Sequence, residues 1–430
     1  MPQSKFTPAN KSVLLLSSLS LLLTWPITPM ALPNFDFASS WEVEANIAYE
    51  AKVYQQKGDQ VRDRDNQSLI FNSEFYTTWN DGADSLTIEP VYRFDQQDNR
   101  RSNFDFIEFV WTHVGENYES KLGISKVFWG VTESQHLVDI INQTDLADNI
   151  DGEGKLGQPM FSLAFEDDWG NLDLYFLTGF RERTFAGQDG RLRGPLVVNE
   201  DAPLFESGAK RRRLDVALRW SFSLSDWDIA VSHFSGTSRE PDLLIDLSSV
   251  AQLRPFYPVI DQTGIELQYI YNDTIWKLEG FSRSGQGSRF AAITAGFEST
   301  FIGVLNSRAN VGLVMEYLYD ERQEAAPVGV FEQDLFVGTR IALNDTAGST
   351  ALIGMFWDPE TEEQIFRIEG QRRLTDQWTI NINANILRAD DINASNLNNV
   401  LQNLQLLDPN NKLGFISQDD YIQIELVRFF

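Results

Sequence analysis

The sequence predicts an all-β fold, a transmembrane antiparallel up-and-down β-barrel of about 18 strands within a range of 16–18. Three observations predict it. Apolar and polar residues alternate with a period of two in many segments, as in strands with one apolar and one polar face. Short and long connections alternate between these segments. After the first 31 residues no long apolar run occurs, so only closed strands could cross a membrane.

The alternating segments can be followed along the whole chain. In 41–53 the odd positions are apolar and most even positions are polar or charged. Boundaries read from such patterns are good to about two to four residues. Eighteen segments of this kind begin near residues 41, 67, 85, 103, 118, 160, 171, 211, 227, 263, 274, 289, 308, 333, 349, 363, 377 and 420.

The connections between these segments are sorted by length. Short ones are Gly, Asn and Asp turns, such as 80–84, 225–226 and 272–273. Most of the connections that alternate with these short turns are longer and polar, such as 129–159 and 388–419. Short turns at one end and long loops at the other are typical of outer-membrane barrels, which place the turns in the periplasm and the loops outside.

The N-terminus predicts export. Lys5 and Lys11 precede the apolar stretch 13–25, which is too short to span a membrane as a helix. We therefore expect a signal peptide at 1–31, cleaved after Ala31, and a single barrel domain at 32–430. The alternative is a short N-terminal helix of a cytoplasmic protein.

The composition excludes several classes of function. The chain has 430 residues, with 35 Lys and Arg against 62 Asp and Glu, a net charge of −27 and no cysteine. Nucleic-acid backbones need basic partners, so we expect no nucleic acid. Without cysteine there are no disulfides, thiolate metal sites or cysteine nucleophiles. We expect no cofactor and no metal.

The C-terminal segment "YIQIELVRFF" resembles the last strand of outer-membrane barrels, which typically ends in an aromatic residue. The resemblance implies that Phe430 is recognised by the barrel-assembly machinery. Arg428 departs from the pattern, because the family usually has an apolar or aromatic residue there.

A barrel of this size leaves a water-filled lumen. The polar faces of the strands carry both charge signs, and we expect inward acids roughly to match inward bases. Charged walls select and orient solutes. The alternative is that these charges pair across strands and only solvate the interior. The basic candidates for the pore lining are Arg93, Arg181, Arg213, Arg219, Arg340 and Arg367.

The connection 129–159 follows the fifth predicted strand. Its part "HLVDIINQTDL" has helical spacing. A long third loop folds into the lumen in general porins, and by that resemblance this loop would narrow the pore. The alternative is an external acidic loop that contacts solvent or cations bound to lipopolysaccharide. The acidic constriction candidates are Glu133, Asp139, Asp145, Asp148 and Asp151.

The same stretch resembles an uncharacterised family of exported barrels with a WG…NxxD motif. The match covers about thirty positions, and its broader relatives include substrate-selective porins and exporters of acidic polysaccharide. Arg181, Arg183 and 210–213 form a basic group at two strand ends. This group favours the hypothesis of an exporter of acidic polysaccharide, and its alternative role is to bind lipopolysaccharide phosphates. The matching residues are Gly123, Lys126, Trp129, Gly130, Asn142 and Asp145.

Enzyme motifs are absent from the sequence. It contains three histidines and neither H-E-x-x-H nor G-x-S-x-G. A hydrolytic triad would have to consist of Ser134, His136 and Asp139 within one loop, an arrangement without strong precedent. We therefore expect no enzyme. The stretch "DNIDGE" lacks full calcium-loop spacing.

The function expected from the sequence is that of an outer-membrane porin, a channel for small polar or charged solutes through a lumen narrowed by 129–159. The alternatives are a structural or adhesive binding barrel with a plugged lumen, and an exporter of acidic polysaccharide. Expected partners are outer-membrane lipids, lipopolysaccharide, the assembly machinery and a small polar solute. The sequence is compatible with both a homotrimer and a monomer.

Overall fold

The computed structural model describes residues 41–58, 61, 63–322, 331–392, 397–405 and 412–430. The predicted signal peptide lies outside them. Eighteen strands form one closed sheet. In chain order they are β1 (Glu42–Tyr54), β2 (Asp65–Trp79), β3 (Asp84–Asp95), β4 (Asn103–Val114), β5 (Tyr118–Ser125), β8 (Gln158–Asp167), β9 (Gly170–Leu177), β12 (Asp215–Leu224), β13 (Trp227–Thr237), β16 (Val259–Tyr271), β17 (Thr274–Ser284), β18 (Phe290–Phe301), β19 (Asn310–Asp320), β20 (Gln333–Ala342), β21 (Thr350–Trp357), β22 (Gln364–Thr375), β23 (Trp378–Arg388) and β24 (Tyr421–Phe429).

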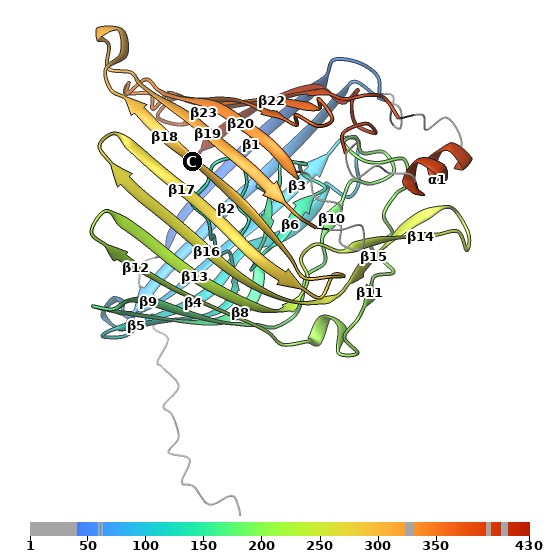
Figure 1. Ribbon diagram of the computed structural model, residues 1–430. Helices are drawn as coiled ribbons and strands as arrows, with labels where there is room; N and C mark the ends of the chain where they lie inside the picture. Colours follow the sequence, from blue (N-terminus) through green and yellow to red (C-terminus); the bar gives the residue numbers. More distant parts are fainter. Residues whose placement is uncertain (1–40, 59–60, 62, 323–330, 393–396, 406–411) are drawn as a thin grey trace, which may run out of the picture. The chain divides into compact units, whose positions relative to one another are not determined.

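The sheet closes because its first and last strands pair. Each strand is antiparallel to its chain neighbours in the sheet, and β1 pairs with both β2 and β24. The register places Tyr49 opposite Leu426, and the backbone N–H of Phe430 donates to Ala45 O at 3.0 Å. The predicted antiparallel barrel of 18 strands is confirmed (Figure 1).

Alternating side chains face opposite sides of the barrel wall. On β12, Val216 and Leu218 are 40% and 41% exposed, whereas Asp215 and Ala217, which alternate with them, are buried. The apolar face is therefore the outer face of the barrel, and the polar face points into the lumen.

The inner face is more acidic than the sequence analysis expected. Residues directly opposite each other in the register point to the same side, so the inner positions follow from the strand pairing. The expected balance of inward charge is wrong: the inner bases are Lys52, Arg93, Lys121, Arg219, Lys277, Arg283, Arg340, Arg367 and Arg373, whereas the inner acids include Glu44, Glu50, Glu74, Glu89, Asp95, Asp105, Glu108, Glu119, Asp173, Asp215, Glu266, Glu279, Glu298, Glu316, Asp320, Asp334, Glu369 and Glu425.

The two ends of the barrel differ, as predicted. Tight turns such as 225–226 and 272–273 close one end, where Ser225 and Asn272 adopt left-handed φ values of 56° and 52°. Such φ values match the twist of paired strands in short hairpins. Three short 3-10 helices are η1 (Asn80–Gly82), η2 (Lys210–Arg212) and η3 (Val304–Asn306). Among the described residues no helix is long and apolar enough to cross a membrane.

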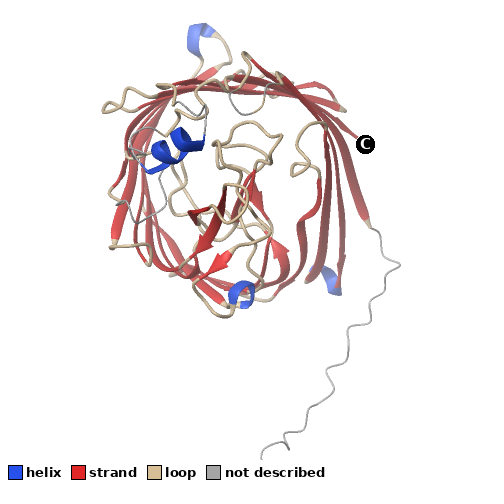
Figure 2. Ribbon diagram, turned by 90° about the vertical axis from the view of Figure 1, so that its right-hand side faces the viewer, coloured by secondary structure: helices blue, strands red, loops and turns tan. Residues whose placement is uncertain are grey.

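The long connections at the other end carry their own small elements. They are β6 (Gln143–Leu146), β7 (Lys155–Leu156), β10 (Thr184–Phe185), β11 (Leu204–Phe205), β14 (Asp242–Asp246), β15 (Gln252–Tyr257) and the helix α1 (Leu397–Gln405). Viewed from this end, loops and short strands lie inside the ring of barrel strands (Figure 2). Three long connections meet in small sheets: β10 pairs with β6, and β11 and β14 pair with β15.

Candidate functional site

The inner loop, defined as residues 126–157 between β5 and β8, contains all five predicted acidic constriction residues. Its side chains contact strands on several sides of the lumen. The predicted helix in "HLVDIINQTDL" is wrong: 136–142 are irregular and β6 follows. The apolar spacing there serves packing against the wall instead, because Val138, Ile140 and Ile141 are buried in one cluster with wall residues.

That apolar cluster fixes the loop to the side of the barrel from which it departs. Trp129 and Val138 pack with Phe234 of β13 and Ile260 of β16, and all four are almost fully buried. The Trp129 ring lies edge-on to Tyr175 of β9, with centroids 5.7 Å apart. Burying a large apolar side chain stabilises a fold by about 1.5–3 kcal/mol. The first part of the loop is therefore firmly packed.

Two buried wall carboxylates, Glu279 of β17 and Glu316 of β19, bind the next part of the loop; we call them the carboxylate pair. Glu279 Oε1 accepts hydrogen bonds from the backbone N–H groups of Val131 at 2.6 Å and Thr132 at 2.8 Å. Glu316 accepts from the backbone N–H groups of Glu133 and Ser134, each at 2.8 Å. Such charge-assisted bonds are about twice as strong as neutral ones.

The loop then reaches the opposite wall. Glu133 forms an ion pair with Arg340 of β20, which also lies 3.4 Å from Glu298. In the strand order of the barrel, β20 stands half-way around from β5, where the loop begins. The inner loop therefore crosses the full width of the lumen.

The far part of the loop contacts a third region of the wall. Asp148 Oδ1 lies 2.7 Å from Arg93 of β3 and 2.8 Å from Arg101, and both arginines also pair with Glu50 of β1. Burial would raise the pKa of Asp148, but the charges of Arg93 and Arg101 hold it well below its usual range. Asn149 accepts a hydrogen bond of 2.9 Å from the hydroxyl of Tyr421 on β24.

Asp139 and His136 are titratable side chains of the loop, the first buried and the second partly buried. Asp139 has a 1% exposed side chain and lies 3.3 Å from Lys155, and burial raises the pKa of its carboxyl group. His136 Nδ1 lies 3.8 Å from Glu279, and Nε2 lies 4.0 Å from Glu153. Burial would lower the pKa of His136, but the carboxylates of Glu279, Glu153 and Asp139 raise it above 6.5.

The other two acidic candidates stabilise turns of the loop, and Asp145 also contacts Thr184 of β10. Asp145 accepts the hydroxyl hydrogen bond of Thr184 and a backbone bond from Ala147 at 3.1 Å. Asp151 accepts from Asn149 and from the backbone N–H of Glu153 at 3.0 Å. Both carboxylates therefore hold turns.

The remaining basic candidates mostly pair with wall acids. Arg219 binds Glu266 through two hydrogen bonds of 2.8 and 2.9 Å, and Arg181 lies 2.7 Å from Asp105. Arg213 pairs with Asp215 near the long-loop end. Arg367 differs, because its nearest carboxylate is Glu369 at 3.9 Å and its guanidinium lies 5.5 Å from the Phe356 ring.

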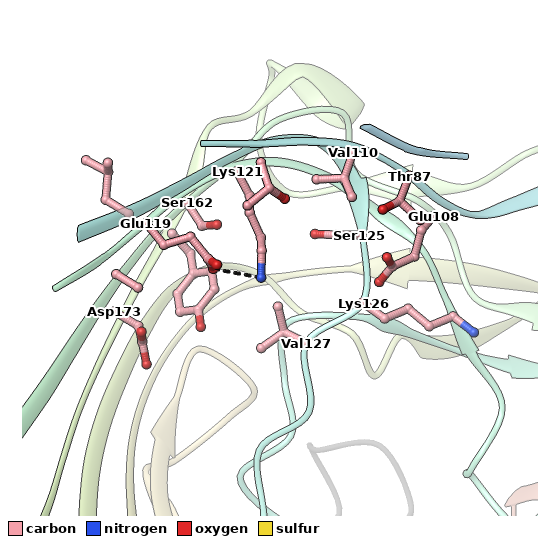
Figure 3. Close-up of a pocket in the computed structure, with 14 residues that line it drawn as sticks. Thr87, Glu108, Val110, Glu119, Lys121, Ser125, Lys126, Val127, Ser162 and Asp173 are labelled. Atoms are coloured by element: carbon pink, nitrogen blue, oxygen red, sulfur yellow. Dashed lines mark ion pairs between the residues drawn. The ribbon is translucent and has the colours of Figure 1, made fainter. Parts of the chain in front are cut away.

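Of the cavities that border the inner loop, three have volumes of about 180 Å³ or more. The first, of about 350 Å³, lies against β3–β9, and its charged lining includes Glu119, Lys121 and Asp173 (Figure 3). The second, of about 180 Å³, is bounded by His136, Glu153 and Arg367. The third, of about 440 Å³, lies between Glu133, at the tip of the loop, and the wall of β20–β24.

The residues that fix the loop were not predicted from the sequence. Glu279, Glu316 and Glu50 are inward-facing strand carboxylates, indistinguishable by pattern from their neighbours. Arg101 lies in the connection 96–102 and pairs with the buried Glu50 and Asp95 and with the partly exposed Asp148. The one available signal was their position on the polar face of predicted strands.

The fold and its inner loop define a class of protein: large closed β-barrels whose lumen is crossed by a loop, as in porins. No family model matches the chain, and no curated protein matches it. Solved structures do. They include the BenF-like porin of Pseudomonas fluorescens Pf-5 (TM-score 0.50, 9% identity, 91% of this chain and 98% of that chain).

Two further solved structures are similar over most of the chain. OccK8 (OprE) of Pseudomonas aeruginosa has a TM-score of 0.51 at 8% identity, covering 91% of this chain and 98% of that one. Wzi of Escherichia coli, described as an outer membrane protein involved in group 1 capsule assembly and a carbohydrate-binding β-barrel, has a TM-score of 0.51 at 10% identity, covering 89% and 83%. The chain thus has the fold of outer-membrane β-barrel proteins.

Proposed function

We propose that the protein is an outer-membrane channel through which small polar or charged solutes diffuse passively. The observation that carries the proposal is the inner face. It is polar and charged along the barrel and borders cavities of about 350 and 440 Å³ on either side of the inner loop. A barrel of 18 strands is too wide for its own side chains to fill, and the loop narrows it.

The outer face supports a membrane location. It is apolar, and tryptophans cluster near the short-turn end, as interfacial aromatic residues do. Trp227 stacks on Tyr269 with centroids 4.5 Å apart, and Trp276 lies 5.3 Å from Phe297. We infer that this belt lies in the outer membrane, with the long loops outside and in contact with lipopolysaccharide.

We also propose that export precedes insertion and that the assembly machinery recognises the last strand. The departure at Arg428 has a local explanation that supports this. Its guanidinium lies 5.6 Å from the Trp378 ring and 4.9 Å from the Phe430 ring, so aromatic faces accommodate the charge at the interface.

Planar lipid bilayers test the channel. The purified, folded full chain should give stepwise ion currents in salt solution, because the lumen is hydrated. The inner acids should make it prefer K⁺ over Cl⁻. A folded protein that gives no current in bilayers and no solute uptake into liposomes would rule the channel out.

A second candidate is a binding barrel whose lumen the loop closes. It is favoured by the attachment of the inner loop to both sides of the lumen through the carboxylate pair, Arg340 and Arg93, and by the likeness to Wzi. The same bilayer measurement separates the two candidates. The acidic wall disfavours the third, an exporter of acidic polysaccharide, because like charges repel.

A further inference from the structure

Resting on the proposed channel, we propose that the cavity of about 440 Å³ is a subsite for a neutral polyhydroxylated solute of sugar size. Its volume falls within the range of small-molecule sites, about 300–1,000 Å³. It lies where the tip of the inner loop meets the inward-facing wall of β20–β24, so it is open to a solute on this side of the loop.

The wall of this cavity is a grid of amide and carboxylate side chains on three adjacent strands. Across β22, β23 and β24, Gln371 stands opposite Asn381, and Asn381 opposite Glu425. In the next row Glu369 stands opposite Asn383, and Asn383 opposite Gln423. Directly opposite side chains lie about 4.5–5.5 Å apart at Cβ. That spacing is comparable to the separation of equatorial hydroxyl groups on alternate carbons of a sugar ring.

Part of the hydrogen-bonding capacity of the grid is used within the wall. Asn381 Nδ2 donates to Glu425 at 2.7 Å, and Asn385 Nδ2 donates to Asn383 Oδ1 at 3.0 Å. Gln423 Nε2 donates to Glu50 at 3.2 Å. These bonds fix the orientation of the amides before any solute arrives, which lowers the entropic cost of binding.

The rest of that capacity faces the cavity. Among the described residues, the Gln371 amide, Asn383 Nδ2, Asn381 Oδ1 and Gln423 Oε1 have no hydrogen-bond partner, and all four residues line the cavity. Amides offer both donors and acceptors. A hydroxyl group also donates and accepts at one atom, so a polyol can satisfy the whole set.

The charges around the grid disfavour anions. Glu133 and Arg340 form an ion pair at the rim of the cavity, and Glu369 and Glu425 place carboxyl groups on its wall. The cavity on the other side of the loop differs, because its lining includes Glu119, Lys121, Lys126 and Asp173 and no amide. The neutral polar chemistry is therefore specific to the β20–β24 side.

The test compares three probes of nearly equal size: glucose, gluconate and glucosamine. Each is added to single channels of the full chain in planar bilayers, and the fluctuation of the K⁺ current is recorded against concentration. Glucose should produce saturable fluctuations and gluconate much weaker ones. The double variant Asn381→Leu/Asn383→Leu keeps similar side-chain volumes and should weaken the glucose effect about tenfold, the loss expected for one to two hydrogen bonds.

The control variant is Gln268→Leu, which removes an inward-facing amide on β16, outside the three cavities. It should leave the glucose effect unchanged. Equal effects of gluconate and glucose, an effect of glucosamine alone, or equal losses in both variants would overturn the subsite. Absence of any current would instead refute the channel, and calorimetric titration of glucose into the detergent-solubilised protein would then decide the subsite by itself.

Discussion

Glu279 and Glu316 are the residues that determine where the inner loop lies. Both are buried on the wall, with 0% and 1% exposure, and both accept backbone hydrogen bonds from residues 131–134. A buried carboxylate is costly unless its oxygens are bonded. The loop amides satisfy the carboxylates, and the carboxylates in turn satisfy loop amides that would otherwise be buried without partners.

Replacing both carboxylates by amides, in Glu279→Gln/Glu316→Gln, should loosen the loop. A neutral amide oxygen accepts more weakly than a carboxylate, and each charged hydrogen bond contributes about 1.5–3 kcal/mol. We expect a noisier single-channel current and faster limited proteolysis within 131–138. Glu266→Gln is the control, because Glu266 is equally buried but pairs with Arg219 on the wall. If that variant loosens the loop as much, the carboxylate pair has no special role.

His136 makes loop attachment dependent on pH. The groups that face it are Glu279 of β17 together with Glu153 and Asp139 of the loop, and Lys155 pairs with Asp139. Because these carboxylates raise the pKa of His136, its stabilising charge is fully present below pH 6.5 and is lost as the pH rises through the raised value.

Current noise should therefore increase as the pH rises above 6.5, because the pKa of His136 is shifted upward. His136→Gln should abolish this dependence. His113→Gln should preserve it, because His113 pairs with Asp84 near the short-turn end. A pH profile that is identical in the wild type and in His136→Gln would contradict the role given to His136.

At the scale of elements, the inner loop is held at three separated regions of the wall. The apolar cluster fixes it near β9–β16, the carboxylate pair and Arg340 hold it at β17–β20, and Arg93 with Arg101 holds Asp148 near β1–β3. Anchoring at three places holds this long connection in one position across the lumen, as the proposed constriction requires.

Replacing 132–154 by a short Gly-Ser linker should raise single-channel conductance several-fold, because the crossing segment is removed while β5 and β8 stay paired. Trimming 247–251, the connection between β14 and β15, is the control and should leave conductance unchanged. Unchanged conductance in the first variant would mean that the ions take a path that the inner loop does not narrow.

At the scale of the whole molecule, the barrel is closed by the pairing of β1 with β24 and is apolar outside and acidic inside. In the proposed outer-membrane location, the difference between the two ends predicts its orientation. Long loops are expected outside and short turns inside. The absence of cysteine makes this orientation directly measurable, since any introduced thiol is the single one.

Single-cysteine variants test the orientation on cells. Ser249→Cys, exposed in the β14–β15 connection, should react with a membrane-impermeant maleimide on intact cells. Ser307→Cys, exposed next to η3 at the short-turn end, should react only after the outer membrane is permeabilised. The reverse labelling pattern would show that the long loops face the periplasm. If neither residue is labelled in any fraction, the proposed outer-membrane location is contradicted.

The sequence by itself determined the wall of this protein. Alternation is a local property, because successive side chains of a strand point to opposite faces, and turn residues act over two to four positions. Eighteen strands, their order and the identity of the long loops could therefore be predicted. The alternation also placed Arg93, Arg219, Arg340 and Arg367 on the inner face.

Only the tertiary structure decided what the lumen contains. The contacts of Glu133 with Arg340 and of Thr132 with Glu279 join residues far apart in the chain, and no local pattern encodes them. The apolar spacing of 136–142 is a further example. It predicted a helix, but these apolar side chains instead pack against the barrel wall. Whether an inward carboxylate lines water, binds a loop amide or faces a cavity depends on which chain segment folds over it, and closure of the barrel decides that.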